Sequence, residues 1–160
     1  MISVIRDVTE RHAGVSALRD SEERFRSSFD HAPIGMALVA LDGRFLQVNR
    51  ALCELVGYTE QELLGMSSRD IVHPDDLADA LELRKRLAAG DIDTYQLEKR
   101  YVCKDGHVVW ILLTGSLVHQ RGLPSYIITH ILDITERRHL EMDRAVMLAS
   151  EREYNRQLRS

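Results

Sequence analysis

Two long apolar runs, HVVWILLTGSLVH (residues 107–119) and PSYIITHILDI (residues 124–134), decide the fold of this chain. Both are rich in β-branched and aromatic residues, which favour strands. The first run is apolar on both faces, with Trp110 and Leu112 on one and Val109, Ile111 and Leu113 on the other. A sheet with one solvent-exposed face would alternate more clearly between apolar and polar residues. The runs therefore predict a sheet that is covered on both faces.

Three further strands precede these runs. The stretch TYQLEKRYVC (94–103) alternates, and one side carries Tyr95, Leu97, Lys99 and Tyr101. Asp105-Gly106 then predicts a tight turn into the first long run. Upstream, IGMALVAL (34–41) and RFLQVN (44–49) flank Asp42-Gly43, a pair typical of hairpins. The hairpins require antiparallel pairing.

Capping residues delimit three helices between residues 49 and 90. Asn49 can cap a helix that Gly57 ends, and Thr59 with Glu62 forms a capping box for a short helix before Gly65. HPDD (73–76) places a proline and two acidic residues at the start of a third helix, with His73 as a cap. The element order predicts an α+β fold with one sheet.

Amphipathic helices are expected at both ends. A helix from about residue 9 to 29 carries an apolar stripe of Val8, Val15, Leu18 and Phe25. It can cover the second sheet face of its own chain or cross to a partner, and the sequence does not choose. After residue 139, apolar residues recur at seven-residue spacing, but polar residues interleave with them. This predicts either a weak coiled coil or a solvated helix.

Composition restricts the function. The net charge of −4 gives no basic patch, so we expect no nucleic-acid partner. No apolar run approaches the roughly 18 residues of a membrane span, and we expect no membrane contact. Two cysteines, Cys53 and Cys103, suit reduced thiols in the cytoplasm. The chain has no phosphate-binding glycine loop, nucleophile elbow or metal-ligand spacing, so we expect neither catalysis nor a metal.

Several phrases in this order and spacing resemble the PAS sensory domain over residues 21–138: GYTEQELLG (57–65), HPDD (73–76), KDGHVVW (104–110) and DITERR (133–138). The resemblance implies a five-stranded antiparallel sheet in the order 2-1-5-4-3, with short helices on one face and flanking terminal helices. It also implies that Asp133, Thr135 and Glu136 form the hinge between the last strand and a signalling helix, residues 139–160.

The closing phrase also occurs near the start, as DVTER at Asp7 and DITER at Asp133, an offset of 133 − 7 = 126 residues. This spacing is about one domain. Residues 1–20 are therefore expected to be the end of a preceding PAS domain with its linker helix, and the chain an internal part of a multidomain bacterial protein.

Cofactors follow from the same resemblance. Flavin-binding members carry a cysteine in an Asn-Cys-Arg-Phe-Leu-Gln run, whereas Cys53 lies in RALCELVGY. Haem-binding members use a histidine on the long helix, and residues 75–89 contain none. We expect neither flavin nor haem. A small organic ligand stays open, as does a filled core without one; the candidate lining residues are Leu52, Val56, Ile71, Trp110 and Leu112.

The function implied is a sensory and dimerisation module that regulates a downstream signal-transduction enzyme in the same chain. A sensor histidine kinase is the first candidate for that enzyme. A diguanylate cyclase or phosphodiesterase is the alternative, and a ligand-free interaction scaffold is a further one. We expect a homodimer held chiefly by the N-terminal helix.

Overall fold

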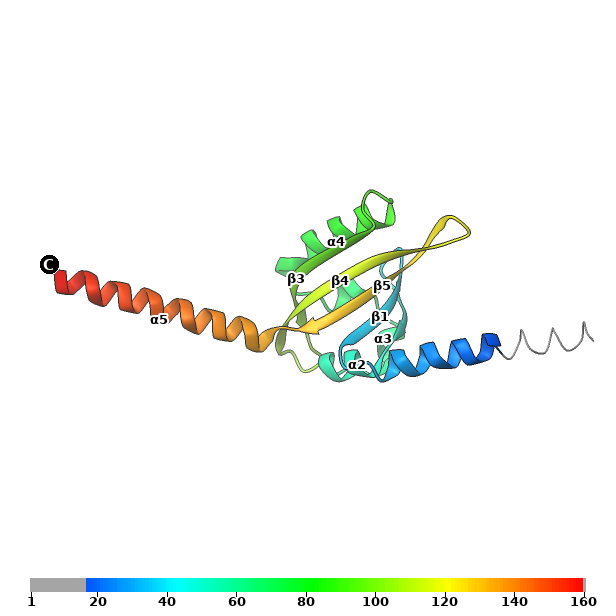
Figure 1. Ribbon diagram of the computed structural model, residues 1–160, viewed down its shortest axis with the longest axis horizontal. Coiled ribbons are helices and arrows are strands. Elements are labelled where there is room, and N and C mark those ends of the chain that lie inside the picture. Colours follow the sequence, from blue (N-terminus) through cyan, green and yellow to red (C-terminus); the bar gives the residue numbers. More distant parts are fainter. Residues whose placement is uncertain (1–16, 160) are drawn as a thin grey trace, which may run out of the picture.

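The computed structural model describes residues 17–159 and contains one five-stranded antiparallel sheet. The strands are β1 (Gly35–Ala40), β2 (Phe45–Val48), β3 (Thr94–Val102), β4 (Val108–Gln120) and β5 (Leu123–Asp133). Their order is β2-β1-β5-β4-β3, with β1 and β5 adjacent near the middle (Figure 1). The expected α+β fold and strand order are confirmed.

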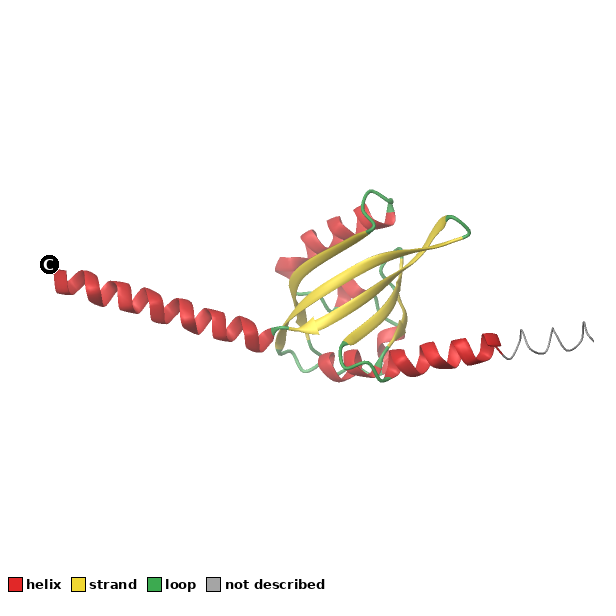
Figure 2. Ribbon diagram, in the orientation of Figure 1, coloured by secondary structure: helices red, strands yellow, loops and turns green. Residues whose placement is uncertain are grey.

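Helices between β2 and β3 cover one face of this sheet (Figure 2). They are α2 (Arg50–Val56), α3 (Glu60–Leu64), a 3-10 helix (Ser68–Asp70) and α4 (Pro74–Ala88). The predicted caps are present: the Asn49 side chain accepts from Leu52 N, Thr59 and Glu62 form a capping box, and the His73 side chain accepts from Asp75 N. The core lies between these helices and the inner sheet face.

The side chains of β4 that face the core are not the ones predicted to line a ligand site. Val109, Ile111 and Leu113 are buried in the core, whereas Trp110 and Leu112 are half-buried on the outer face. The prediction that Trp110 and Leu112 line an inner pocket is therefore wrong. Successive strand residues point to opposite faces, and both sets are apolar here, so the pattern could not assign the inner face.

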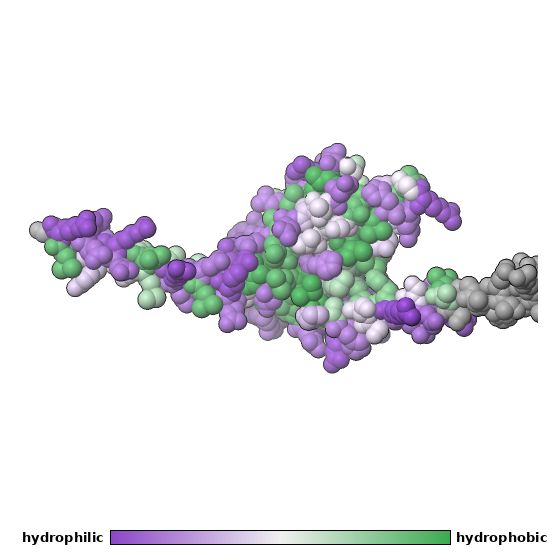
Figure 3. Space-filling model, in the orientation of Figure 1, coloured by the Kyte–Doolittle hydropathy of each residue, from purple (hydrophilic) through white to green (hydrophobic). Residues whose placement is uncertain are grey.

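The N-terminal helix occupies residues 17–30 of the described chain and does not cover the sheet. Figure 1 shows it running away from the domain, and residues 17–28 are all exposed. Leu18 is 61% exposed and Phe25 46%. Val8 and Val15 lie outside the described residues. The outer sheet face therefore has no cover from its own helix, and Figure 3 shows hydrophobic side chains gathered over the sheet.

The C-terminal helix α5 (Thr135–Arg159) extends from the other end of the domain (Figure 1). None of its 25 residues is buried. Its apolar side chains Leu140, Met147 and Tyr154 are each more than half exposed. Across residues 17–159, no helix combines the length and apolar character required to cross a membrane.

Candidate functional site

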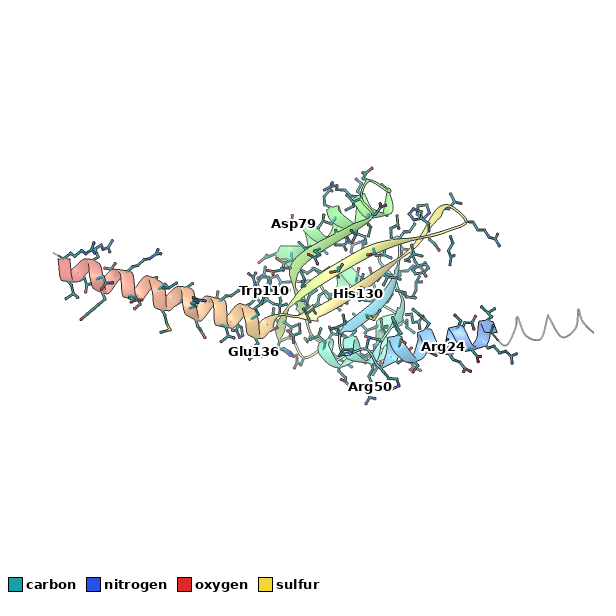
Figure 4. All side chains as sticks on the ribbon, in the orientation of Figure 1. Arg24, Arg50, Asp79, Trp110, His130 and Glu136 are labelled. Carbon is teal, nitrogen blue, oxygen red and sulfur yellow. The ribbon has the colours of Figure 1, made fainter. Side chains whose placement is uncertain are left out.

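The junction between β5 and α5 is fixed to β4 by hydrogen bonds. Asp133 Oδ1 accepts from the Thr135 amide at 2.9 Å and from the Thr135 hydroxyl at 2.6 Å. Thr135 Oγ1 accepts from Trp110 N at 3.0 Å, and Ile134 N donates to Trp110 O at 2.9 Å. Asp133 thus accepts from the amide of the first residue of α5 and closes a short turn at the start of the helix. Glu136 lies exposed in the first turn, where a negative charge suits the helix dipole (Figure 4).

Above this junction, the Trp110 ring contacts guanidinium groups from two elements. Arg138 of α5 lies 3.7 Å from the ring centroid, and Arg100 of β3 lies 5.1 Å from it. Such cation–π contacts are each worth about 0.5–1 kcal/mol at exposed sites. Arg138 also pairs with Glu98 of β3 at 3.7 Å. The first turn of α5 is therefore held on the sheet by its side chains as well as by its backbone.

Arg100 continues this set of contacts to α4. Asp76, in the first turn of α4, accepts from Arg100 Nε at 3.0 Å, from Nη2 at 2.9 Å and from the Arg100 amide at 2.8 Å. The hydrogen bonds from Arg100 hold the Asp76 pKa below its usual range. Asp76, Arg100, Trp110 and Arg138, which we call the α4–α5 contact chain, join α4 to α5 across the outer edge of the sheet.

A small cavity lies on the inner side of the sheet, between the strands and α4. Its volume is about 20 Å³, roughly room for one water molecule. One part of its wall is polar and comprises Ser68, Arg84, Tyr95, Lys99, Tyr101 and Thr129. The other part is apolar and comprises Val39, Phe45, Leu113 and Ile127.

Lys99 is the buried cation of this cavity, with 4% of its surface exposed. Its Nζ lies 5.5 Å from the Tyr101 ring centroid. Within residues 17–159 it forms no ion pair with a carboxylate. Burial, together with the positive charge of Arg84, lowers the Lys99 pKa to about 8, and the negative charge of Asp76 opposes this shift. A buried ammonium group without an anionic partner is costly.

Arg84 closes the cavity on the α4 side. Its Nη1 donates to Ser68 Oγ at 2.9 Å, and burial lowers its pKa. The same nitrogen lies against the turn between β1 and β2, where a Cβ on Gly43 would be 1.9 Å from it. Gly43 also has φ +99°, a conformation that glycine adopts readily. The Asp42-Gly43 turn therefore makes the hairpin and also leaves space for Arg84.

The structure separates the residues predicted to line a ligand site. Leu52, Val56 and Ile71 are fully buried in the core, and Trp110 and Leu112 lie across the sheet from them. The polar lining of the cavity was not predicted. The sequence did carry one signal for it, since Lys99 falls on the same side of β3 as Tyr95 and Tyr101.

Two further kinds of site would need a reactive cysteine or a group of metal ligands among the described residues. Cys53 and Cys103 are free thiols, and burial raises the pKa of each. A thiol with a raised pKa is a poor nucleophile at neutral pH. Between residues 17 and 159, no three histidine, cysteine or acidic side chains are grouped to hold a metal ion.

Two kinds of relative resemble the chain. It is 43% identical over 125 residues to a probable diguanylate cyclase, DgcE, of Escherichia coli K12. The aligned segment covers 78% of this chain and 11% of that protein. It is 30% identical over 123 residues to the sensor histidine kinase TmoS of Ectopseudomonas mendocina, covering 76% and 13%. The chain thus spans only a small part of these relatives.

Solved structures and a family model agree on the fold. The PAS domain of an HTR-like protein from Haloarcula marismortui superposes with a TM-score of 0.65 at 21% identity, over 77% of this chain and 99% of that one. A domain of a sensor histidine kinase/response regulator from Geobacter sulfurreducens gives a TM-score of 0.63 at 22% identity, over 72% and 96%. The model that describes the PAS fold matches residues 45–131. With strand order, caps and motifs in agreement, the chain belongs to the PAS family of sensory domains.

Proposed function

We propose that this domain is a sensory and dimerisation module that regulates an output enzyme through α5. The observation that carries the proposal is the junction at Asp133 and Thr135. There, a 25-residue helix with no buried side chain starts directly from the sheet and is bonded to β4. A change within the domain at β3 or β4 reaches this helix through the α4–α5 contact chain.

The output enzyme is either a diguanylate cyclase or a sensor histidine kinase. The identity of 43% to a probable diguanylate cyclase, against 30% to the kinase TmoS, supports the cyclase as the first candidate. The domain itself regulates and does not catalyse in this proposal. In this proposal residues 1–20 are the end of a preceding domain with its linker helix, and the two free thiols suit a cytoplasmic location.

Homodimerisation is the second part of the proposal. The N-terminal helix exposes Leu18 and Phe25, and the outer sheet face presents Met36, Leu38 and Ile128 without cover from its own helix. Contiguous apolar surfaces of this kind mark interaction sites. A second copy offers a matching helix and sheet face, and α5 of the two copies can then run side by side into the output domains.

Insertions into α5 test how the module transmits a signal. Four alanines inserted after Met147 in the full-length protein shift the phase of the helix, whereas seven keep it, because paired helices repeat every seven residues. We expect the four-residue insertion to change basal output and the seven-residue insertion to preserve it. Output is measured as cyclic diguanylate formed from GTP and as phosphohistidine formed from ATP. Equal output from both insertions would contradict transmission through α5.

A further inference from the structure

The cavity beneath α4 has an excess of positive charge that the described part of the chain does not balance. Lys99 and Arg84 both line it, and the lining includes no carboxylate. Asp76 is the acidic residue whose charge acts on Lys99, but it is held by Arg100 through three hydrogen bonds of 2.8–3.0 Å. The Lys99 side chain is more than nine-tenths buried; among residues 17–159 its Nζ lies 5.5 Å from the Tyr101 ring centroid and has no hydrogen-bond or ion-pair partner.

Hydrogen-bond donors converge on the same space. Tyr95 and Tyr101 bring phenol groups to the lining, and Arg84 brings a guanidinium group. The Thr129 hydroxyl also lines the cavity, but its proton is donated to Ala37 O at 3.1 Å. The cavity therefore presents two cations and two phenols to whatever occupies it, which is the environment that an anion requires.

The rest of the lining is apolar. Val39, Phe45, Leu113 and Ile127 form a surface that a strongly hydrated inorganic anion would gain little from contacting. A short organic acid uses both halves, with its carboxylate on the cations and its carbon chain on the apolar wall. We propose that this cavity binds a small carboxylate through Lys99 and Arg84.

Arg84 also explains how such a ligand enters. The cavity as it stands holds about one water, so a carboxylate needs additional space. Arg84 is half-buried and is held by one hydrogen bond, to Ser68. Movement of this side chain opens the cavity toward solvent and brings the guanidinium group onto the carboxylate. Because Arg84 lies on α4, whose first turn holds Asp76, ligand binding is coupled to the α4–α5 contact chain.

Calorimetric titration of the 160-residue chain tests the proposal with potassium propionate and succinate, against potassium chloride and phosphate at equal ionic strength. We expect at least one carboxylate to bind and to raise the melting temperature. Lys99→Met should abolish binding, and Arg84→Met should weaken it at least tenfold, a loss of about 1.4 kcal/mol. Lys85→Met, at an exposed position next to Arg84 on α4, is the matched control and should bind as the wild type does.

Three results would overturn the inference: no binding of either carboxylate, equal binding by chloride or phosphate, or unchanged carboxylate binding in Lys99→Met. Arg84→Met serves as the second variant, because its half-buried position tolerates substitution better if Lys99→Met does not fold. The inference rests on the proposed sensory function, but the titration needs no output domain. If no carboxylate binds but the two α5 insertions differ in output as expected, the carboxylate site is refuted and the proposed sensory function is not.

Discussion

At the scale of single residues, the buried positive charge of Lys99 lowers the stability of the folded chain, and this loss can be measured. Its pKa is about 8 in the folded chain, against 10.5 for an ordinary lysine. Between these two values the unfolded chain binds the lysine proton more tightly than the folded one, so stability must rise with pH in that window. Below pH 8 both states carry the proton, and the folded state bears the full cost of the buried charge.

The corresponding prediction is a pH-dependent difference between the wild type and Lys99→Met. From about pH 7.5 to about pH 9.5, the free energy of unfolding of the wild type should rise by roughly 2 kcal/mol relative to Lys99→Met. Urea unfolding without added carboxylates measures it, and Lys85→Met should follow the wild type. Parallel profiles for the wild type and Lys99→Met would show that the buried ammonium has an anionic partner or is hydrated.

At the scale of elements, the start of α5 depends on one carboxylate. Asp133→Ala removes the acceptor for the amide and the hydroxyl of Thr135. Loss of a side-chain acceptor at a helix start costs about 0.5–2 kcal/mol. Hydrogen exchange of the first-turn amides of α5 should accelerate, while the β4 and β5 amides stay protected. Asp143→Ala, at an exposed position further along α5, is the control. Unchanged exchange in Asp133→Ala would contradict the hinge.

The contact between Arg138 and Trp110 can be followed by fluorescence, since the chain has a single tryptophan. Arg138→Gln removes the guanidinium group 3.7 Å from the ring centroid and leaves the ring more open to water. We expect the emission maximum to move to longer wavelength. Arg144→Gln, one to two turns further along α5, should leave the spectrum unchanged. Identical spectra for Arg138→Gln and the wild type would show that this contact does not form in solution.

Helix caps could be predicted, because each depends on residues that are close in the sequence. Contacts between distant parts of the chain could not. Asn49, Thr59 and His73 each act on an amide two or three residues away, so their caps could be read from neighbouring residues. The remaining hydrogen bonds of the Asn49 side chain are distant in sequence: Nδ2 donates to Phe29 O at 2.9 Å and to Ile34 O at 3.0 Å, and Oδ1 accepts from Met36 N at 2.8 Å. Nothing in the local sequence indicates such partners.

The candidate site was missed for a related reason. Both faces of β4 are apolar, so hydrophobicity could not tell Trp110 from Ile111 as the inward residue. The neighbouring strand β3 held the better signal, because a lysine between two tyrosines on one side is unusual for a core face. The polar cavity also requires Arg84, which lies on α4, 99 − 84 = 15 residues before Lys99. The sequence of β3 alone could not show that these two cations line the same cavity.

At the scale of the whole molecule, the two terminal helices leave the domain in different directions (Figure 1). Apart from Phe29, none of their described residues is buried. A helix stabilised by so few contacts within its own chain is marginal unless it packs against something else. The N-terminal helix, the outer sheet face and α5 all present apolar residues, and a second copy of the chain would bury all three.

The last prediction is that the chain is a dimer held chiefly by its N-terminal helix. Full burial of a leucine or phenylalanine side chain is worth roughly 1.5–3 kcal/mol. Leu18→Asp combined with Phe25→Asp should therefore abolish the dimer. Because both side chains are about half exposed or more, the core should stay folded, as judged by a melting transition that remains cooperative. Arg24→Glu, on the same helix, should remain dimeric (Figure 4). Light scattering distinguishes the states: a wild-type mass near 18.3 kDa at every concentration would show that these apolar surfaces do not pair two copies.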